Sequence, residues 1–135
     1  MVQRPFPREL VALEQIREFV REEFRQWNVP QDAAWDVDLV LEELFTNVLK
    51  YGHPSATPVT VSLEWCKPLL TIELRDADSD FFDPTSVPAP DTDRPIAERS
   101  AGGLGLHIIR KMAVRFAYTY EGRVSLTTVT LRLES

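Results

Sequence analysis

The chain is organised around the stretch Asp36-Val-Asp-Leu-Val-Leu-Glu-Glu-Leu-Phe-Thr-Asn-Val-Leu-Lys-Tyr51. Its apolar residues recur every three or four positions, which predicts a helix packed against a core. Glu43 and Asn47 lie four residues apart, so the helix places both on one face, away from the apolar stripe. Asn is a poor helix former because its amide competes for backbone hydrogen bonds. A solvated helix face is the ordinary explanation for such a pair, and only the remaining chain can favour a functional one.

The composition indicates one soluble globular domain. Its 135 residues can bury a sizeable core, and 44% apolar with 27% charged residues is an ordinary balance. The sequence shows no apolar run of membrane-spanning length and no signal-peptide pattern, so we expect a cytoplasmic protein without membrane contact. The single cysteine, Cys66, fits a reducing compartment and excludes a cysteine-rich metal site. A net charge of −6 argues against direct nucleic-acid binding.

The residues before the central stretch predict an extended lead-in and a first helix. Residues 1–7 contain two prolines, and residues 1–6 are almost too short to supply an edge strand. Apolar residues from Leu10 to Trp27 keep helical spacing, which predicts an amphipathic helix of roughly 18–20 residues. The segment from Asn28 to Asp32 breaks it, and either of these two residues can cap the second helix.

Beyond residue 58 the apolar period changes from 3.6 to two, which predicts strands. Residues 59–65 and 70–75 form one hairpin, with Pro68 in its connection. Residues 116–120 and 124–133 form another, which turns at Gly122-Arg123. The apolar alternation of the last strand slips at Thr127-Thr128, so we expect a bulge or a late strand start there.

Between the two hairpins lie a long irregular segment and a third helix. Residues 76–101 lack periodicity and contain four prolines, which favours a functional loop such as a lid over a ligand, at about residues 77–101. The third helix opens at Gly102. This order of elements predicts one domain over residues 1–135: an α+β two-layer sandwich with a mostly antiparallel sheet and about three helices on one face.

Three features in this order could form one site. Glu43 and Asn47 share a helix face, and Asp76 ends a strand at a sheet end, where ligands commonly bind. Gly102-Gly-Leu-Gly105 precedes a helix N-terminus, whose free N–H groups and dipole attract phosphate. A glycine-rich turn alone is weak evidence, since glycines also permit close packing. The strand–GxxxxGK[ST]–helix pattern of a P-loop is absent.

Together, these features resemble the nucleotide site of the GHKL ATPase superfamily, and more narrowly the anti-sigma-factor serine/threonine kinases. The resemblance covers about residues 8 to 133 and implies the Bergerat-type ATP-binding fold, with ATP and Mg²⁺ as cofactors. Glu43-Leu-Phe-Thr-Asn47 is similar to the N-box of that family, and Gly103-Leu-Gly105-Leu106 to its glycine box. Phe82-Asp83-Pro84 matches the Phe-Asp-Pro that often follows the strand-ending Asp.

The resemblance also assigns roles to individual residues. It implies that Glu43 is the general base, that Asn47 is a ligand of the Mg²⁺ bridging the ATP phosphates, and that Asp76 binds adenine. Arg99 and Lys50 are candidates for balancing phosphate charge. The further nucleotide contacts that it implies are Asp78, Phe82, Gly102, Gly103, Leu104, Gly105 and Leu106.

By the same resemblance, the chain would phosphorylate an anti-anti-sigma factor, a STAS-type domain with a target Ser or Thr. The same surface would sequester a sigma factor, and the protein would be a homodimer. A stand-alone histidine-kinase-type catalytic domain is a less attractive alternative, because dimerisation helices with a phospho-accepting His are absent from the sequence.

One departure from the family pattern supports a second alternative. Asp78 stands where the family has the Gly of Asp-x-Gly, and the loop carries one extra residue. A negative charge there could crowd the base and repel nucleotide, which would leave a nucleotide-independent protein-binding module of the same fold. The spacing of Asp76, Asp78 and Asp80 also suggests a calcium loop, but the Gly and closing Glu of such a loop are missing.

Overall fold

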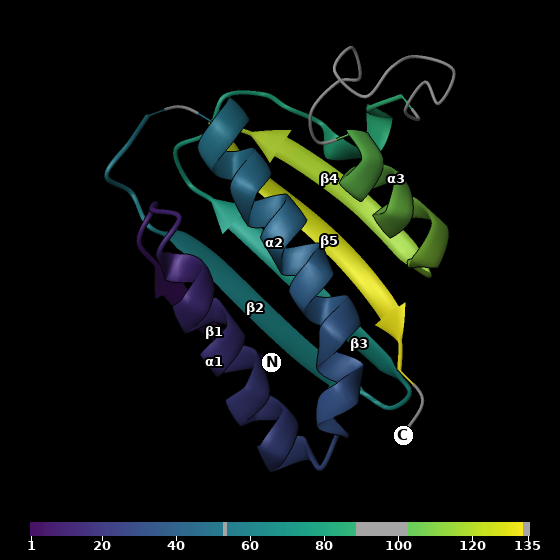
Figure 1. Ribbon diagram of the computed structural model, residues 1–135. Coiled ribbons are helices and arrows are strands. Elements are labelled where there is room, and N and C mark those ends of the chain that lie inside the picture. Colours follow the sequence, from purple (N-terminus) through teal and green to yellow (C-terminus); the bar gives the residue numbers. More distant parts are fainter. Residues whose placement is uncertain (53, 89–102, 134–135) are drawn as a thin grey trace.

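The computed structural model describes residues 1–52, 54–88 and 103–133. These residues form a five-stranded sheet, three α-helices and two short 3-10 turns (Figure 1). In chain order the elements are β1 (Val2–Phe6), α1 (Ala12–Trp27), η1 (Gln31–Ala33), α2 (Ala34–Tyr51), β2 (Val59–Cys66), β3 (Leu69–Asp76), η2 (Pro84–Ser86), α3 (Gly103–Met112), β4 (Arg115–Glu121) and β5 (Val124–Arg132).

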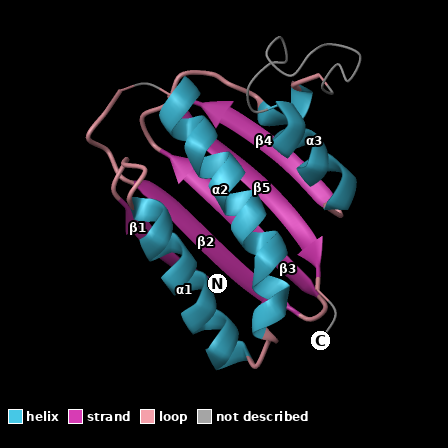
Figure 2. Ribbon diagram, in the orientation of Figure 1, coloured by secondary structure: helices cyan, strands magenta, loops and turns pink. Residues whose placement is uncertain are grey.

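The sheet has the strand order β1-β2-β3-β5-β4, and every neighbouring pair is antiparallel. The three helices lie on one face of this sheet (Figures 1 and 2). The predicted α+β two-layer sandwich is therefore confirmed. Pairing of β3 with β5 brings two strands that are far apart in the sequence to the centre of the sheet, so their ends can contribute side chains to one site.

The hydrophobic core fills the space between the helices and the sheet. All three helices contribute, and β2 and β3 turn alternate residues inward, as strands with one covered face do. Burying each large side chain stabilises the fold by about 1.5–3 kcal/mol. The largest fully buried side chains are Phe6, Ile16, Phe19, Phe24, Leu41, Phe45, Leu63, Leu70, Ile72, Leu74, Leu106 and Ile109.

In the N-terminal part, the structure answers one question that the sequence left open and corrects one prediction. Residues 2–6 supply an edge strand, since β1 pairs with β2 from Val2 opposite Leu63 to Phe6 opposite Val59. Its neighbour α1 begins at Ala12 and has 16 residues, so it is shorter than predicted. A turn over residues 7–11 takes up the difference, since its backbone hydrogen bonds run locally, for example from the amide of Ala12 to the carbonyl of Glu9.

The predicted cap of the second helix is also wrong. Asn28 ends α1 instead, in a left-handed conformation with φ of 57° that Asn tolerates better than most residues. The turn η1 leads directly into α2, whose N-cap residue Ala33 makes no side-chain capping hydrogen bond. Because η1 continues into the helix, Asp32 lies within a helical turn rather than at the cap position.

The predicted bulge in the last strand does not exist. β5 pairs with β3 without interruption from Arg132 opposite Leu69 to Ser125 opposite Asp76. Ser125 and Thr127 face the helices on the side where Val129 and Leu131 are buried. The apolar pattern slips because two polar residues occupy inward positions, while the backbone remains regular.

Candidate functional site

The acid of the central helix meets the first turn of α3. A side-chain carbon added to Gly105 would overlap the carboxyl group of Glu43, so only glycine leaves room for this contact. Gly105 is the third residue of α3, where backbone N–H groups lack partners within the helix. Glu43 of α2 and the glycine-rich start of α3 are far apart in the sequence. In the fold they lie together.

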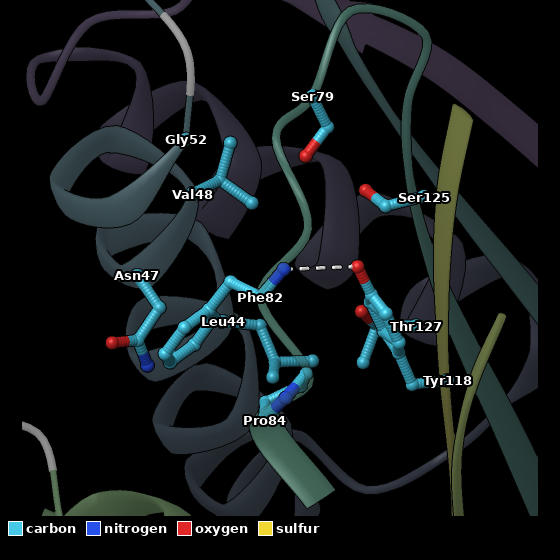
Figure 3. A pocket seen from close by; sticks show the side chains of 10 residues that line it. All are labelled: Leu44, Asn47, Val48, Gly52, Ser79, Phe82, Pro84, Tyr118, Ser125 and Thr127. Carbon is cyan, nitrogen blue, oxygen red and sulfur yellow. Dashed lines mark hydrogen bonds between the residues drawn. The ribbon is translucent and has the colours of Figure 1, made fainter. Parts of the chain in front are cut away.

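Asn47 is buried beside Glu43, with 6% of its surface exposed. Its amide nitrogen donates to the Glu43 backbone carbonyl at 2.8 Å and to the Glu43 Oε1 atom at 3.1 Å. These bonds explain how an Asn persists in mid-helix. They also fix the orientation of the amide, whose oxygen points away from the Phe82 ring (Figure 3).

Burial raises the pKa of the Glu43 carboxyl above its ordinary value of 4.5. The Asn47 amide opposes this rise by donating a hydrogen bond, neighbouring Glu42 adds to it, and Lys50 opposes it. A carboxylate with a raised pKa is a stronger proton acceptor, which is a common property of catalytic acids and bases.

Asp76 ends β3 with its side chain under the helix layer, and it is only 1% exposed. Both of its oxygens accept hydrogen bonds from one guanidinium: Arg8 Nη1 lies 2.9 Å from Oδ2, and Nη2 lies 2.5 Å from Oδ1. The backbone amide of Asp78 also donates to Oδ1, at 3.0 Å. Asp76 is thus an ion-paired, nearly inaccessible carboxylate.

Asp78, the residue at the family's glycine position, is bound on the other side of the loop. Its Oδ1 atom lies 2.9 Å from Nη2 and 3.0 Å from Nε of Arg123, a residue in the turn between β4 and β5. The same guanidinium reaches Asp80, with 3.2 Å between Nη1 and Oδ1. The charge of Asp78 is therefore compensated by an arginine.

The loop after β3 is also held by two tyrosines of β4. The Tyr118 hydroxyl accepts from the Phe82 backbone amide at 3.2 Å, and the Tyr120 hydroxyl donates to the Ser79 carbonyl at 2.8 Å. Burial raises the pKa of the Tyr118 hydroxyl, against the effect of its hydrogen bond with Phe82. The loop thereby brings the Phe82 ring into a parallel stack on Tyr51, 4.5 Å between centroids.

A cavity lies between α2, this loop and the ends of β4 and β5 (Figure 3). The volume of this cavity is about 30 Å³. A buried water needs about 10–15 Å³, so the cavity has room for about two waters. Its walls combine apolar side chains with hydroxyl groups: Leu44, Asn47, Val48, Gly52, Ser79, Phe82, Pro84, Tyr118, Ser125 and Thr127.

The other predicted site residues are distributed unevenly. Lys50 is exposed, with its ammonium 5.0 Å from the centre of the Tyr51 ring. Leu106 belongs to the hydrophobic core, whereas Leu104 is 58% exposed. Gly103 begins α3. Arg99 and Gly102 lie outside the described residues.

The structure adds site residues that the sequence did not indicate. Arg8 comes from the turn between β1 and α1, and no local pattern connects it with Asp76. Ser125 and Thr127 could have been found, because inward polar residues produce the slip in the apolar alternation of β5. Tyr118 was predicted only as part of an alternating strand.

The calcium-loop interpretation finds no support in this geometry. Asp76 is paired with Arg8, while Asp78 and Asp80 bind Arg123 on the exposed side of the loop. Within residues 1–52, 54–88 and 103–133, no cluster of three or more acidic, histidine or cysteine side chains could hold a metal. None of the helices in these ranges is both long and apolar enough to span a membrane.

An antiparallel sheet covered on one face by three helices is the architecture of the histidine kinase-like ATPase domains. The model of the histidine kinase-like ATPase domain matches residues 6–133, and the chain belongs to this family. Among solved structures, the histidine kinase AdeS of Acinetobacter baumannii is similar, with a TM-score of 0.51 and 14% identity over 100% of this chain and 69% of that one. At this identity the likeness concerns the fold alone. No curated protein matches the chain.

Proposed function

We propose that the protein is an ATP-dependent serine/threonine kinase of the anti-sigma-factor type. The observation that supports this most is the contact of Glu43 and its partner Asn47 with the first turn of α3 at Gly105. In the proposal, this corner binds the phosphates and is called the phosphate end. The base end comprises Asp76 and the adjoining cavity.

Each residue of the phosphate end has a chemical role in the proposal. Glu43 accepts the proton of the attacking hydroxyl, and its raised pKa suits that role. The Asn47 amide oxygen would hold Mg²⁺, an ion that needs few protein oxygens beside phosphates and water. The free N–H groups of the α3 start bind phosphate oxygens. Mg-ATP supplies the terminal phosphoryl group and much of the charge neutralisation.

The proposed protein substrate is a STAS-type anti-anti-sigma factor with a target Ser or Thr. The same protein would sequester a sigma factor until this antagonist competes, and it would act as a homodimer. These partners rest on the resemblance to the anti-sigma kinases, while family membership supports the ATP-binding domain itself.

The kinase proposal is tested by two variants of adjacent glutamates. Calorimetric titration should detect Mg-ATP binding to the wild-type protein, which should then transfer phosphate to a STAS protein from the same organism. Glu43→Ala should abolish transfer and retain binding. Glu42→Ala is the matched control, because Glu42 is exposed and pairs with Arg17 at 3.5 Å. Equal transfer by wild type and Glu43→Ala would remove Glu43 from the mechanism.

The second candidate is a nucleotide-independent binding module of the same fold. The Arg8–Asp76 pair favours it, because the guanidinium occupies the carboxylate that would bind the base. In that case millimolar Mg-ATP should produce neither heat nor a shift in Tm in any variant, while sigma-factor binding persists. Recovery of ATP binding by Asp78→Gly would instead place the defect at the family's glycine position.

A further inference from the structure

Arg8 lies in the turn between β1 and α1, and its side chain contacts Asp76 at the end of β3. Its side chain is 7% exposed, and its Nε atom also donates to the Thr57 carbonyl at 3.3 Å. The two residues are 68 positions apart in the chain. A bidentate guanidinium–carboxylate pair is among the strongest and most directional contacts that a protein can form.

The pair borders the cavity of the base end. Asp76 lies opposite Ser125 in the β3–β5 ladder, and Ser125 is part of the cavity wall. On the other side, a side-chain carbon added to Gly52, another wall residue, would lie 3.6 Å from Arg8 Nη1. Arg8 Nη1 therefore lies near one wall residue of the cavity, and Asp76 lies beside another in the sheet.

Arg8 occupies two of the acceptor positions of Asp76 that a base could use. A carboxylate selects adenine by accepting from its amino group, and two ionised oxygens offer about four acceptor positions. Arg8 and the Asp78 amide already use three of them, counting Nη1, Nη2 and the amide nitrogen. The guanidinium presents N–H donors to Asp76 just as an adenine amino group would.

We infer that Arg8 competes with adenine for Asp76 and thereby sets the nucleotide affinity of the site. This inference rests on the proposed function, since it requires that the protein binds ATP at all. Without nucleotide, the Arg8 guanidinium is paired with the Asp76 carboxylate. When nucleotide is bound, the guanidinium has moved to solvent. Arg8 is thus a specificity-determining residue outside the motifs of the family.

The turn that carries Arg8 allows this movement. Residues on both sides of it are exposed, namely Pro7, Glu9, Leu10 and Val11. The turn is held by local backbone bonds such as that from the Glu9 amide to the Pro7 carbonyl, 2.8 Å long. A rotation of the Arg8 side chain therefore exposes the guanidinium to water without breaking the core.

Nucleotide titrations of Arg8→Ala provide the test. Dissociation constants of Mg-ATP and Mg-GTP are measured by calorimetry on the full chain, after circular dichroism has verified folding. Arg8→Ala should bind ATP at least about tenfold more tightly than wild type, equivalent to about 1.4 kcal/mol. The preference for ATP over GTP should rise by a similar factor, because freed Asp76 accepts from the adenine amino group.

Arg4→Ala is the matched control. Arg4 lies on β1 near Arg8 in sequence, but its guanidinium stacks on Phe19, with 4.8 Å from Cζ to the ring centre. It should leave both nucleotide affinities unchanged. Arg8→Gln serves if Arg8→Ala does not fold, since it keeps most of the side-chain length without the charge, and it should shift affinity in the same direction.

The outcomes separate the inference from the proposed function. If wild type binds ATP and loss of Arg8 tightens neither its binding nor its selectivity, the inference is wrong and the kinase proposal stands. Equal gains for ATP and GTP would show a widened cavity, which also contradicts competition for Asp76. If neither wild type nor any Arg8 variant binds millimolar ATP, the proposed function itself fails.

Discussion

At the base end Asp76 is 1% exposed and held by the fork of Arg8, whereas at the phosphate end Glu43 is half-buried and held by an amide. The first acid has a countercharge in direct contact. The second has a raised pKa because burial outweighs the stabilising contacts around it. The Asp76 carboxylate is thus held in an ion pair, whereas the Glu43 carboxylate accepts a proton more readily than an ordinary glutamate does.

Under the proposed function, this difference matches two requirements of phosphoryl transfer. A proton acceptor must not be neutralised by a tight ion pair, because such a pair lowers its basicity. A carboxylate that binds the adenine base can form such an ion pair while the site is empty, provided that its partner, here Arg8, can leave. The comparison therefore predicts that changes at the base end affect stability strongly and that changes at the phosphate end affect it weakly.

The largest effect is expected for Asp76→Ala. The variant removes a bidentate, charge-assisted contact, and because the Arg8 side chain can then turn to water, the cost is roughly 1.5–3 kcal/mol of unfolding free energy. Urea unfolding followed by circular dichroism measures the loss. The double variant Arg8→Ala/Asp76→Ala should recover part of it. A loss of less than about 1 kcal/mol would show that Arg8 already escapes to solvent in the free protein.

An intermediate effect is expected for Tyr118→Phe. The variant removes the acceptor of the Phe82 amide and should cost about 0.5–1.5 kcal/mol. Hydrogen exchange of the Phe82 amide should accelerate as well. Tyr120→Phe is the matched control, because its hydroxyl bonds to the Ser79 carbonyl and leaves the Phe82 amide protected. Unchanged exchange in Tyr118→Phe would contradict the role assigned to this hydroxyl.

A smaller net effect is expected for Gly105→Ala. Alanine is favoured over glycine in a helix by up to about 1 kcal/mol, but its methyl group displaces the Glu43 carboxyl. The two contributions should nearly cancel in wild type. In a Glu43→Ala background only the gain remains, so a double-mutant cycle measured by urea unfolding should show coupling. Additive changes would mean that Glu43 does not approach α3 in solution.

The smallest effect is a pH-dependent gain in Glu43→Gln. Because the folded-state pKa of Glu43 is raised, the stability connected with this group is fully present below about pH 4.5 and is lost as pH rises through the folded pKa. Glutamine has no such loss, so the Tm of Glu43→Gln should exceed that of wild type by a few degrees at pH 7 and match it near pH 4. Glu42→Gln is the exposed control. A gain that does not change with pH would contradict the burial of Glu43.

The sequence was sufficient where local patterns determine the structure. The apolar spacing of residues 36–51 predicts α2, and the same spacing places Glu43 and Asn47 on one face. Alternating residues predict both hairpins, and their order predicts the layers. The close approach of Gly105 to Glu43 follows from this architecture, since it joins two motifs that the chain presents on adjacent helices.

Long-range and side-chain effects account for what the sequence missed. The pairing of Arg8 with Asp76 depends on where the first turn lies relative to the end of β3, and no periodic pattern encodes that. The slip at Thr127-Thr128 was a real signal with the wrong interpretation, because inward hydroxyls at a cavity produce the same pattern as a bulge. Asn28 was assigned to the wrong helix because Asn suits both N-caps and left-handed C-caps.

The position of Arg8 directly after β1 links the edge of the sheet to the interior of the molecule. Only Pro7 separates it from Phe6, so the Cα atoms of Phe6 and Arg8 lie at most about 7 Å apart. Phe6 is anchored in the core and paired with Val59 of β2. Pulling β1 away from β2 would therefore also extract the guanidinium, so mechanical strain or strand exchange at this border would be transmitted to Asp76 as a change in its charge environment.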